Sequence, residues 1–228
     1  MSFYTNQEKN NWMLHETIKN IVISEERYCV DATYPVYSLR NLHLYAFNTI
    51  IYDEITSYVQ DFINIVQESV LLNGIRYKLN GKHFTYTADR RFITVKLDFY
   101  LLTGGAHSSH TIITITFDTV TDTIIALSDL FDANSNYLER LSLLSEQALF
   151  EKYPDLSFAF TNPTYRKGFA PNEENFTHWA LTDRSLIIFF PEYQVAPYAA
   201  GILEIEIPYL AVKDMIRYNL LTFLYHII

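Results

Sequence analysis

The chain has 228 residues, 49% of them hydrophobic and 19% charged, a balance that provides a substantial core and excludes a disordered or coiled-coil protein. Its formal net charge of −9 argues against a nucleic-acid groove, which needs a basic surface. The single cysteine, Cys29, excludes an internal disulfide and any site built from several cysteines.

The first third of the chain predicts an extended segment followed by a long helix. Residues 17–35 alternate between apolar and polar side chains, and Pro35 is expected to close that segment. Apolar residues then recur every three or four positions over residues 41–72, which is the spacing of an amphipathic helix. Asn73-Gly74 is a suitable stop for this helix.

Strands and a second helix dominate the rest of the chain. Period-two alternation predicts strands at residues 83–87, 92–101, 111–118, 176–181, 186–190 and 203–207. A second helix is expected near residues 136–153, a long loop at 157–175 and a short helix at 210–217. Together these elements predict an α+β fold, in which an antiparallel β-sheet packs against two main helices. We expect two intimately joined halves, residues 1–110 and 111–228.

Most local patterns that could carry chemistry favour a structural interpretation. His107 and His110 stand three residues apart, and on a strand such residues point to opposite faces, so they chelate a metal poorly. No transition-metal site is therefore expected. Glu204 and Glu206 share one face of a predicted strand and could act as an acid–base pair, but such pairs more often form a solvated face.

Two segments are unusual for loops. Residues 101–107 join two alternating strands and place Gly104 and Gly105 side by side, which permits positive φ and close backbone approach. Residues 189–201 form a loop rich in aromatic residues and proline that carries one charge. Because loops are usually polar, this loop must pack on its own domain or on a partner.

Several segments, in this order along the chain, resemble a bacterial domain family shared by RsiV-type anti-sigma factors and PdaC-type peptidoglycan deacetylases. They are Thr-Gly-Gly-Ala-His at 103–107, Phe117-Asp118, residues 127–131, residues 191–201 and residues 207–209. In the first half, residues 34–37 and Asn48-Thr49-Ile50 resemble the companion half of the same family. The resemblance covers residues 17–217.

The resemblance implies an extracytoplasmic, non-enzymatic binding or sensing module of the bacterial cell envelope. In the signalling branch the implied partner is a lysozyme-like protein, and in the deacetylase branch it is a peptidoglycan fragment. No cofactor is expected. The first eleven residues lack the apolar core of a signal peptide, and no apolar run is long enough to span a membrane.

We expect the ligand where the glycine turn and the aromatic loop lie, with no catalytic residue and no metal. Tyrosine side chains would provide stacking area, while His107 and the glycine backbone would provide polar contacts. The candidate ligand-binding residues are Tyr100, Thr103, Gly104, Gly105, His107, Tyr193, Pro197 and Tyr198.

Two alternatives stay open at this point. The motifs could be purely architectural and lock the two halves together, or the protein could be a hydrolase that uses Glu204 or Glu206 with His107. The apolar tail at residues 219–228 must also be buried, either on the chain itself or against a second copy in an oligomer.

Overall fold

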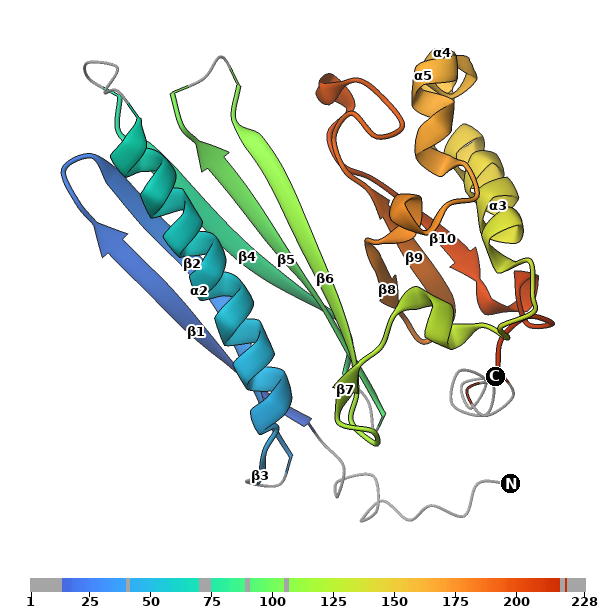
Figure 1. Ribbon diagram of the computed structural model, residues 1–228, viewed down its shortest axis with the longest axis horizontal. Helices are drawn as coiled ribbons and strands as arrows, with labels where there is room; N and C mark the ends of the chain where they lie inside the picture. The colour runs from blue at the N-terminus through green and yellow to red at the C-terminus, as the bar shows by residue number, and fades with distance from the viewer. Residues whose placement is uncertain are drawn as a thin grey trace. The chain divides into compact units, whose positions relative to one another are not determined.

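A computed structural model describes residues 14–39, 42–69, 75–88, 91–104, 107–217 and 220. The chain divides into two compact units (Figure 1). Unit 1 consists of residues 1–113 and 117–123, and unit 2 of residues 114–116 and 124–228. Strands come first in the chain and helices are packed against sheets in each unit, so the predicted α+β class is confirmed.

Unit 1 contains most of a seven-stranded sheet, in which six strands follow the order β1-β2-β4-β5-β6-β7. The seventh strand, β3, pairs with β2 and lies outside this order. The predicted strands at 83–87, 92–101 and 111–118 lie within β4, β5 and β6. The strand bounds are β1 Leu14–Ser24, β2 Tyr28–Leu39, β3 Leu42–His43, β4 Tyr77–Ala88, β5 Phe92–Leu102, β6 Ser109–Asp118 and β7 Thr123–Ile124.

The extended segment at 17–35 is an antiparallel hairpin of β1 and β2, and Pro35 does not end it. Pro35 lies inside β2, opposite Ile18 of β1. The ladder between β2 and β4 covers only Tyr28–Ala32 of β2. Pro35 has no N–H to donate, but it lies beyond this ladder and so interrupts none of its hydrogen bonds.

One strand pair corrects the antiparallel sheet that we expected. β2 and β4 run parallel, with Tyr28 opposite Tyr77 and Ala32 opposite Gly81. The helix α2 (Tyr45–Glu68) lies between these strands in the chain and returns it to the end of the sheet where β2 began. Side-chain alternation is the same in parallel and antiparallel strands, so the sequence pattern could not reveal this direction.

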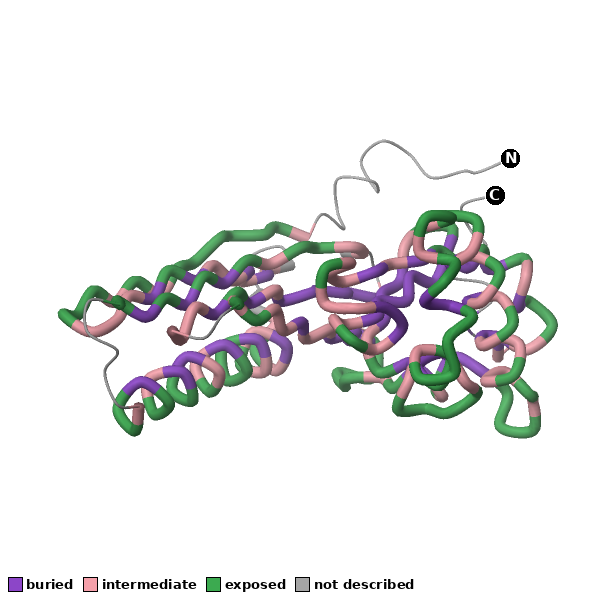
Figure 2. The backbone as a smooth tube through the Cα atoms, turned by 90° about the horizontal axis from the view of Figure 1, so that it is seen from above, coloured by how far each residue is buried: buried purple, intermediate pink, exposed green. Residues whose placement is uncertain are grey.

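The predicted helix at 41–72 is confirmed in its central part as α2, which lies along one face of the sheet (Figure 2). Tyr58 of α2 stacks on Phe99 of β5, with ring centroids 4.0 Å apart. Each large apolar side chain buried in this way contributes about 1.5–3 kcal/mol. The predicted stop at Asn73-Gly74 lies outside the described residues. The buried residues of α2 are Phe47, Ile51, Ile55, Val59, Phe62 and Val66.

Unit 2 is built on a three-stranded antiparallel sheet with the order β10-β9-β8. The strands are β8 (Trp179–Leu181), β9 (Ser185–Phe190) and β10 (Leu203–Pro208). The second predicted helix is α3 (Tyr137–Lys152), which packs against β10. Its buried residues are Leu141, Ser145 and Leu149.

The segment at 157–175 is not the loop that we expected. It contains α4 (Ser157–Thr161), α5 (Pro163–Arg166) and short 3-10 turns. The Asn162 side chain accepts a hydrogen bond from the Thr164 N–H, and Pro163 occupies the first helical position. These local caps stabilise single turns that are too short to show a helical period in the sequence.

The short helix expected at 210–217 is also wrong. The chain forms a 3-10 turn at Tyr209–Ala211, and Ile216 then makes a β-bridge to Phe131. The Arg217 N–H donates to the Leu130 carbonyl at 3.0 Å, and its Nε donates to the Phe131 carbonyl at 2.8 Å. Pairing with this distant segment provides hydrogen-bond partners for backbone N–H and C=O groups that would otherwise pair within a helix.

Most of the apolar tail lies outside the described residues, as do Gly105 and Ala106. Leu220 is described and is buried. An oligomer formed through the tail therefore stays a prediction.

Candidate functional site

A concave surface with aromatic and polar side chains lies on the seven-stranded sheet of unit 1. It is a groove of about 560 Å³ that crosses β2, β4, β5 and β6. We call it the sheet groove. It is lined by Asp31, Thr33, Asn80, Gly81, Lys82, Phe84, Asp98, Tyr100 and His110.

The register of β4 and β5 places the sheet groove on the face opposite α2. Phe99 points to α2, because its ring stacks on Tyr58. The neighbouring residues Asp98 and Tyr100 therefore point to the other face. Across the ladder they pair with Lys82 and Asn80 of β4, which line the same groove.

Two half-exposed aromatic rings stand in the groove, surrounded by hydrogen-bonding groups. Tyr100 is 41% exposed and Phe84 is 44% exposed. The Tyr100 and His110 rings meet edge to face at 5.1 Å, which holds Tyr100 in place from the neighbouring strand. Lys96 lies 4.8 Å from the Phe84 ring centroid and 3.6 Å from the Asp98 carboxylate.

Sequence reasoning identified Tyr100 but missed Phe84, His110, Asp98 and Lys82. A signal was present in part, because residues 80–84 and 96–100 carry aromatic and charged side chains at alternate positions, off the buried face. Which strands would lie side by side, and in what register, was not available from these patterns.

The glycine turn follows β5 directly. Thr103 is half-buried, and Gly104 has φ of +78°, the left-handed backbone that adjacent glycines permit. His107 is exposed after the turn, and Gly105 lies outside the described residues. The turn belongs to unit 1, whereas the aromatic loop at 191–201 belongs to unit 2, so a single site made from both stays a prediction.

The aromatic loop is anchored within unit 2 by its centre. The Gln194 side-chain amide donates to the carbonyls of Gly168 at 2.7 Å and Asn175 at 2.9 Å. Val195 and Ala196 are buried. These contacts give the middle of the motif an architectural role within unit 2.

The aromatic residues of this loop remain partly accessible. Tyr193 is 62% exposed, and its φ of +68° is unusual for a residue with a side chain. Its ring lies 5.8 Å from the ring of Tyr198. Pro197 and Tyr198 are half-buried. The outer side of the loop therefore presents a pair of tyrosines.

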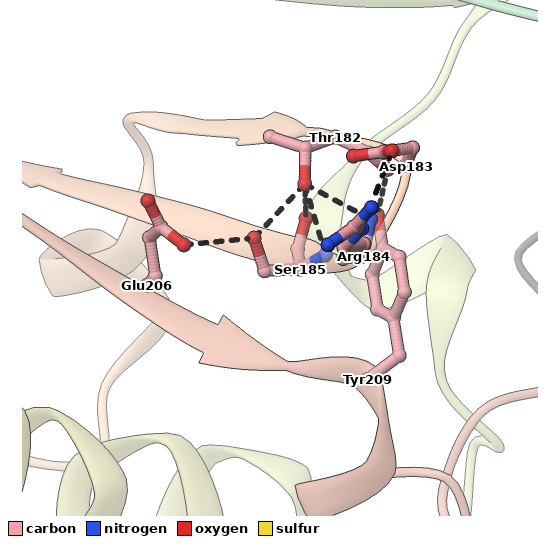
Figure 3. Close-up of polar contacts among 6 residues, drawn as sticks. All are labelled: Thr182, Asp183, Arg184, Ser185, Glu206 and Tyr209. Carbon is pink, nitrogen blue, oxygen red and sulfur yellow. Dashed lines mark hydrogen bonds and ion pairs between the residues drawn. The ribbon is translucent and has the colours of Figure 1, made fainter. Parts of the chain in front are cut away.

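The two glutamates of the hydrolase alternative take part in holding the sheet of unit 2. Glu204 lies 3.4 Å from the Lys152 ammonium group. Glu206 accepts a hydrogen bond from the Ser185 hydroxyl at 3.5 Å, at the base of the β8–β9 hairpin (Figure 3). The Tyr209 hydroxyl donates to the Thr182 carbonyl of the same hairpin at 2.8 Å (Figure 3). These contacts favour a structural role for both carboxylates.

Two other kinds of site are absent from the described residues. No group of three or more metal-ligating side chains comes together there. In the part of the chain that the structure describes, no helix has the length and apolar composition that a membrane crossing requires.

Comparison with known proteins supports the resemblance seen in the sequence. Residues 128–210 match the family model described as a protein of unknown function, DUF3298. The peptidoglycan-N-acetylmuramic acid deacetylase PdaC of Bacillus subtilis is 27% identical over 142 residues, which are 62% of this chain and 30% of the deacetylase. The chain thus spans under a third of that relative.

Two crystal structures share the fold. A DUF3298 family protein from Pseudomonas aeruginosa matches with a TM-score of 0.65 and 16% identity, over 92% of this chain and 96% of that one. A member of the same family from Bacteroides fragilis matches with a TM-score of 0.61 and 18% identity, over 92% and 95% of the two chains. The resemblance to a PdaC-type domain is therefore confirmed.

Proposed function

We propose that this chain, which carries a domain of the DUF3298 and PdaC type, is a non-enzymatic binding module of the bacterial cell envelope. Its ligand is a cell-wall glycan, which it binds in the sheet groove. The observation that carries the proposal is the pair of accessible rings, Phe84 and Tyr100, in a groove lined with hydroxyl, amide and charged groups.

The chemistry of the groove suits a sugar chain. A pyranose has apolar C–H faces that stack on aromatic rings, and equatorial hydroxyls that exchange hydrogen bonds with polar side chains. Phe84 and Tyr100 offer the rings, while Asn80, Lys82 and Asp98 offer donors and acceptors around them. The volume of about 560 Å³ lies within the usual range of ligand sites, roughly 300–1,000 Å³.

The polar groups of the groove are held by contacts within unit 1. Asp98 lies 3.6 Å from the Lys96 ammonium group. A carboxylate placed in this way is an acceptor for the hydroxyl groups of a sugar.

The PdaC relationship supports the choice of ligand and compartment. That relative is named for its action on N-acetylmuramic acid in peptidoglycan, and the matched part is less than a third of it. A domain that brings such an enzyme to its polymer would bind glycan itself. We extend this role, and an extracytoplasmic location, to the present chain.

A lysozyme-like protein is the second candidate ligand. It is favoured by the exposed Tyr193 and the half-buried Tyr198 beside it in unit 2, because tyrosine is enriched at protein interfaces. This candidate uses a different surface, so variants in the two units separate it from the glycan proposal.

The test is co-sedimentation of the purified chain with insoluble peptidoglycan. Phe84→Ala and Tyr100→Ala should each reduce the bound fraction strongly. Tyr45→Ala is the matched control, because Tyr45 is an aromatic residue of the same unit, 76% exposed and outside the groove. Equal binding by all three variants would refute the groove, and loss only with Tyr193→Ala would move the site to unit 2.

A further inference from the structure

A second, smaller cavity lies wholly within unit 2. Its volume is about 260 Å³. It is lined by Thr114, residues 125–126, the 3-10 turn at Leu127–Leu130, the start of α3, the turn before β8 and the first residue of β8. The residues that define its chemistry are Ser128, Tyr137, Glu173, Phe176, Thr177 and Trp179. We call it the Glu173 pocket.

The lining of the Glu173 pocket carries acceptors and aromatic rings and lacks basic side chains. Glu173 is the one carboxylate among the lining residues, and no lysine, arginine or histidine is among them. Three rings surround it, from Tyr137, Phe176 and Trp179. The pocket therefore has one negative charge with no cation in its wall.

The position of the carboxylate is fixed by its neighbours. The Tyr137 hydroxyl donates to Glu173 Oε1 at 2.8 Å. The Tyr137 ring stacks on Phe131, with centroids 4.6 Å apart and planes 6° from parallel. Burial and the Glu173 carboxylate raise the pKa of Tyr137 to about 12, so its hydroxyl stays a neutral donor and does not cancel the negative charge.

The other aromatic rings of the pocket are buried. Trp179 is 5% exposed, and its backbone N–H donates to the Thr114 hydroxyl at 3.1 Å. Phe176 is fully buried and lines the same pocket. A carboxylate in a pocket lined by aromatic rings attracts a cation by its charge, and the negative faces of the rings add to that attraction.

We propose that the Glu173 pocket binds a small organic cation, namely an ammonium group at the end of a short aliphatic chain. The charge pairs with Glu173, the aliphatic part contacts the rings, and the hydroxyls of Ser128 and Thr177 accept the remaining ammonium hydrogens. The volume fits a ligand of this size and is below that of most drug-sized sites. The proposal does not rest on glycan binding, because the sheet groove is in unit 1 and this pocket is in unit 2.

Intrinsic fluorescence provides the test, because the chain has two tryptophans and one of them lines the pocket. In a Trp12→Phe background, Trp179 reports alone. Titration with n-butylammonium chloride should give a saturable change, and n-pentanol, a neutral molecule of similar size, should give none. Nα-acetyl-lysine methylamide should compete with butylammonium if the natural ligand is a lysine side chain of a protein. It should not compete if the pocket admits only small free amines.

Variants of adjacent glutamates provide the matched control. Glu173→Gln should weaken butylammonium binding by about tenfold or more, because it removes the charge and keeps the shape. Glu174→Gln should leave binding unchanged, because Glu174 is as exposed as Glu173 but does not line the pocket. Tyr137→Phe should preserve binding, since it removes a competing donor. Equal binding by Glu173→Gln, saturable binding of pentanol, or no saturation by butylammonium would each overturn the proposal.

Discussion

The side-chain amide of Asn48 pairs with both backbone polar groups of Tyr37. The Tyr37 N–H donates to Asn48 Oδ1, and Asn48 Nδ2 donates to the Tyr37 carbonyl, each at 2.8 Å. The amide thus makes the two hydrogen bonds that a neighbouring strand would make with β2, and it ties the first turns of α2 to the sheet. Both residues belong to the segments that carry the family resemblance in the first half, which assigns those segments an architectural role.

Replacing Asn48 should therefore destabilise unit 1. Asn48→Ala removes the acceptor of the Tyr37 N–H and leaves the Tyr37 carbonyl only the longer hydrogen bond from the Leu44 N–H, at 3.4 Å. The loss of a partner by a buried backbone group costs about 1–3 kcal/mol. The free energy of unfolding in urea is the measurement. Asn64→Ala is the control, because Asn64 is also on α2 and bonds only to the exposed Gln60. If both variants unfold at the wild-type urea concentration, the pairing with Tyr37 does not stabilise the fold.

Two glycines of unit 2 should differ in their response to alanine. A Cβ at Gly168 would overlap the Gln194 carbonyl, a backbone atom that cannot move without displacing the aromatic loop. A Cβ at Gly201 would meet nothing within 4 Å, but φ there is +67°. Gly168→Ala should thus cost more than Gly201→Ala, whose backbone strain is about 1–3 kcal/mol. Urea midpoints of the two variants compare them, and the reverse order would contradict the described packing.

Stability should fall in mild acid partly through His178. Burial disfavours its imidazolium form and lowers the pKa of His178 below 6.5. The unfolded chain then binds a proton at a higher pH than the folded chain does. The buried, neutral His178 therefore makes its full contribution to the free energy of unfolding above the pKa that it has in the unfolded chain. This contribution is lost as the pH falls from the pKa in the unfolded chain to the lower pKa in the folded chain.

His178→Gln should therefore show a shallower loss of unfolding free energy than the wild type between about pH 7 and pH 5. His15→Gln serves as the comparison, because His15 is exposed on β1. Parallel pH profiles for the wild type and His178→Gln would show that the burial of this ring has no effect on stability.

The parts of the fold that the sequence predicted are those with a regular period over many residues. The apolar stripe of α2 and the alternation in β5 identify their elements without knowledge of any neighbour. The parallel direction of β4 and the turns at 157–175 were missed for a different reason. Strand direction depends on how the chain returns, and single turns depend on local caps such as that of Asn162.

The candidate site was only partly predictable on the same grounds. Tyr100 was noticed because it lies beside an unusual glycine turn, whereas Phe84 and His110 come from strands with no such marker. They line the same groove as Tyr100 because β4, β5 and β6 are adjacent, with Asn80 opposite Tyr100 and Phe84 opposite Lys96. A groove on a sheet is set by register, and register was not contained in the alternation of any one strand.

The central claim is that glycan binds to the face of the seven-stranded sheet that lies opposite α2. Amide NMR spectra of the isotope-labelled chain, recorded during titration with a soluble oligosaccharide of N-acetylglucosamine, test this most directly. The account predicts progressive, saturable shifts confined to the strands around Asn80, Phe84, Tyr100 and His110, and their loss in Tyr100→Ala. Shifts centred on residues 191–201, or a spectrum that does not change at saturating oligosaccharide, would contradict it.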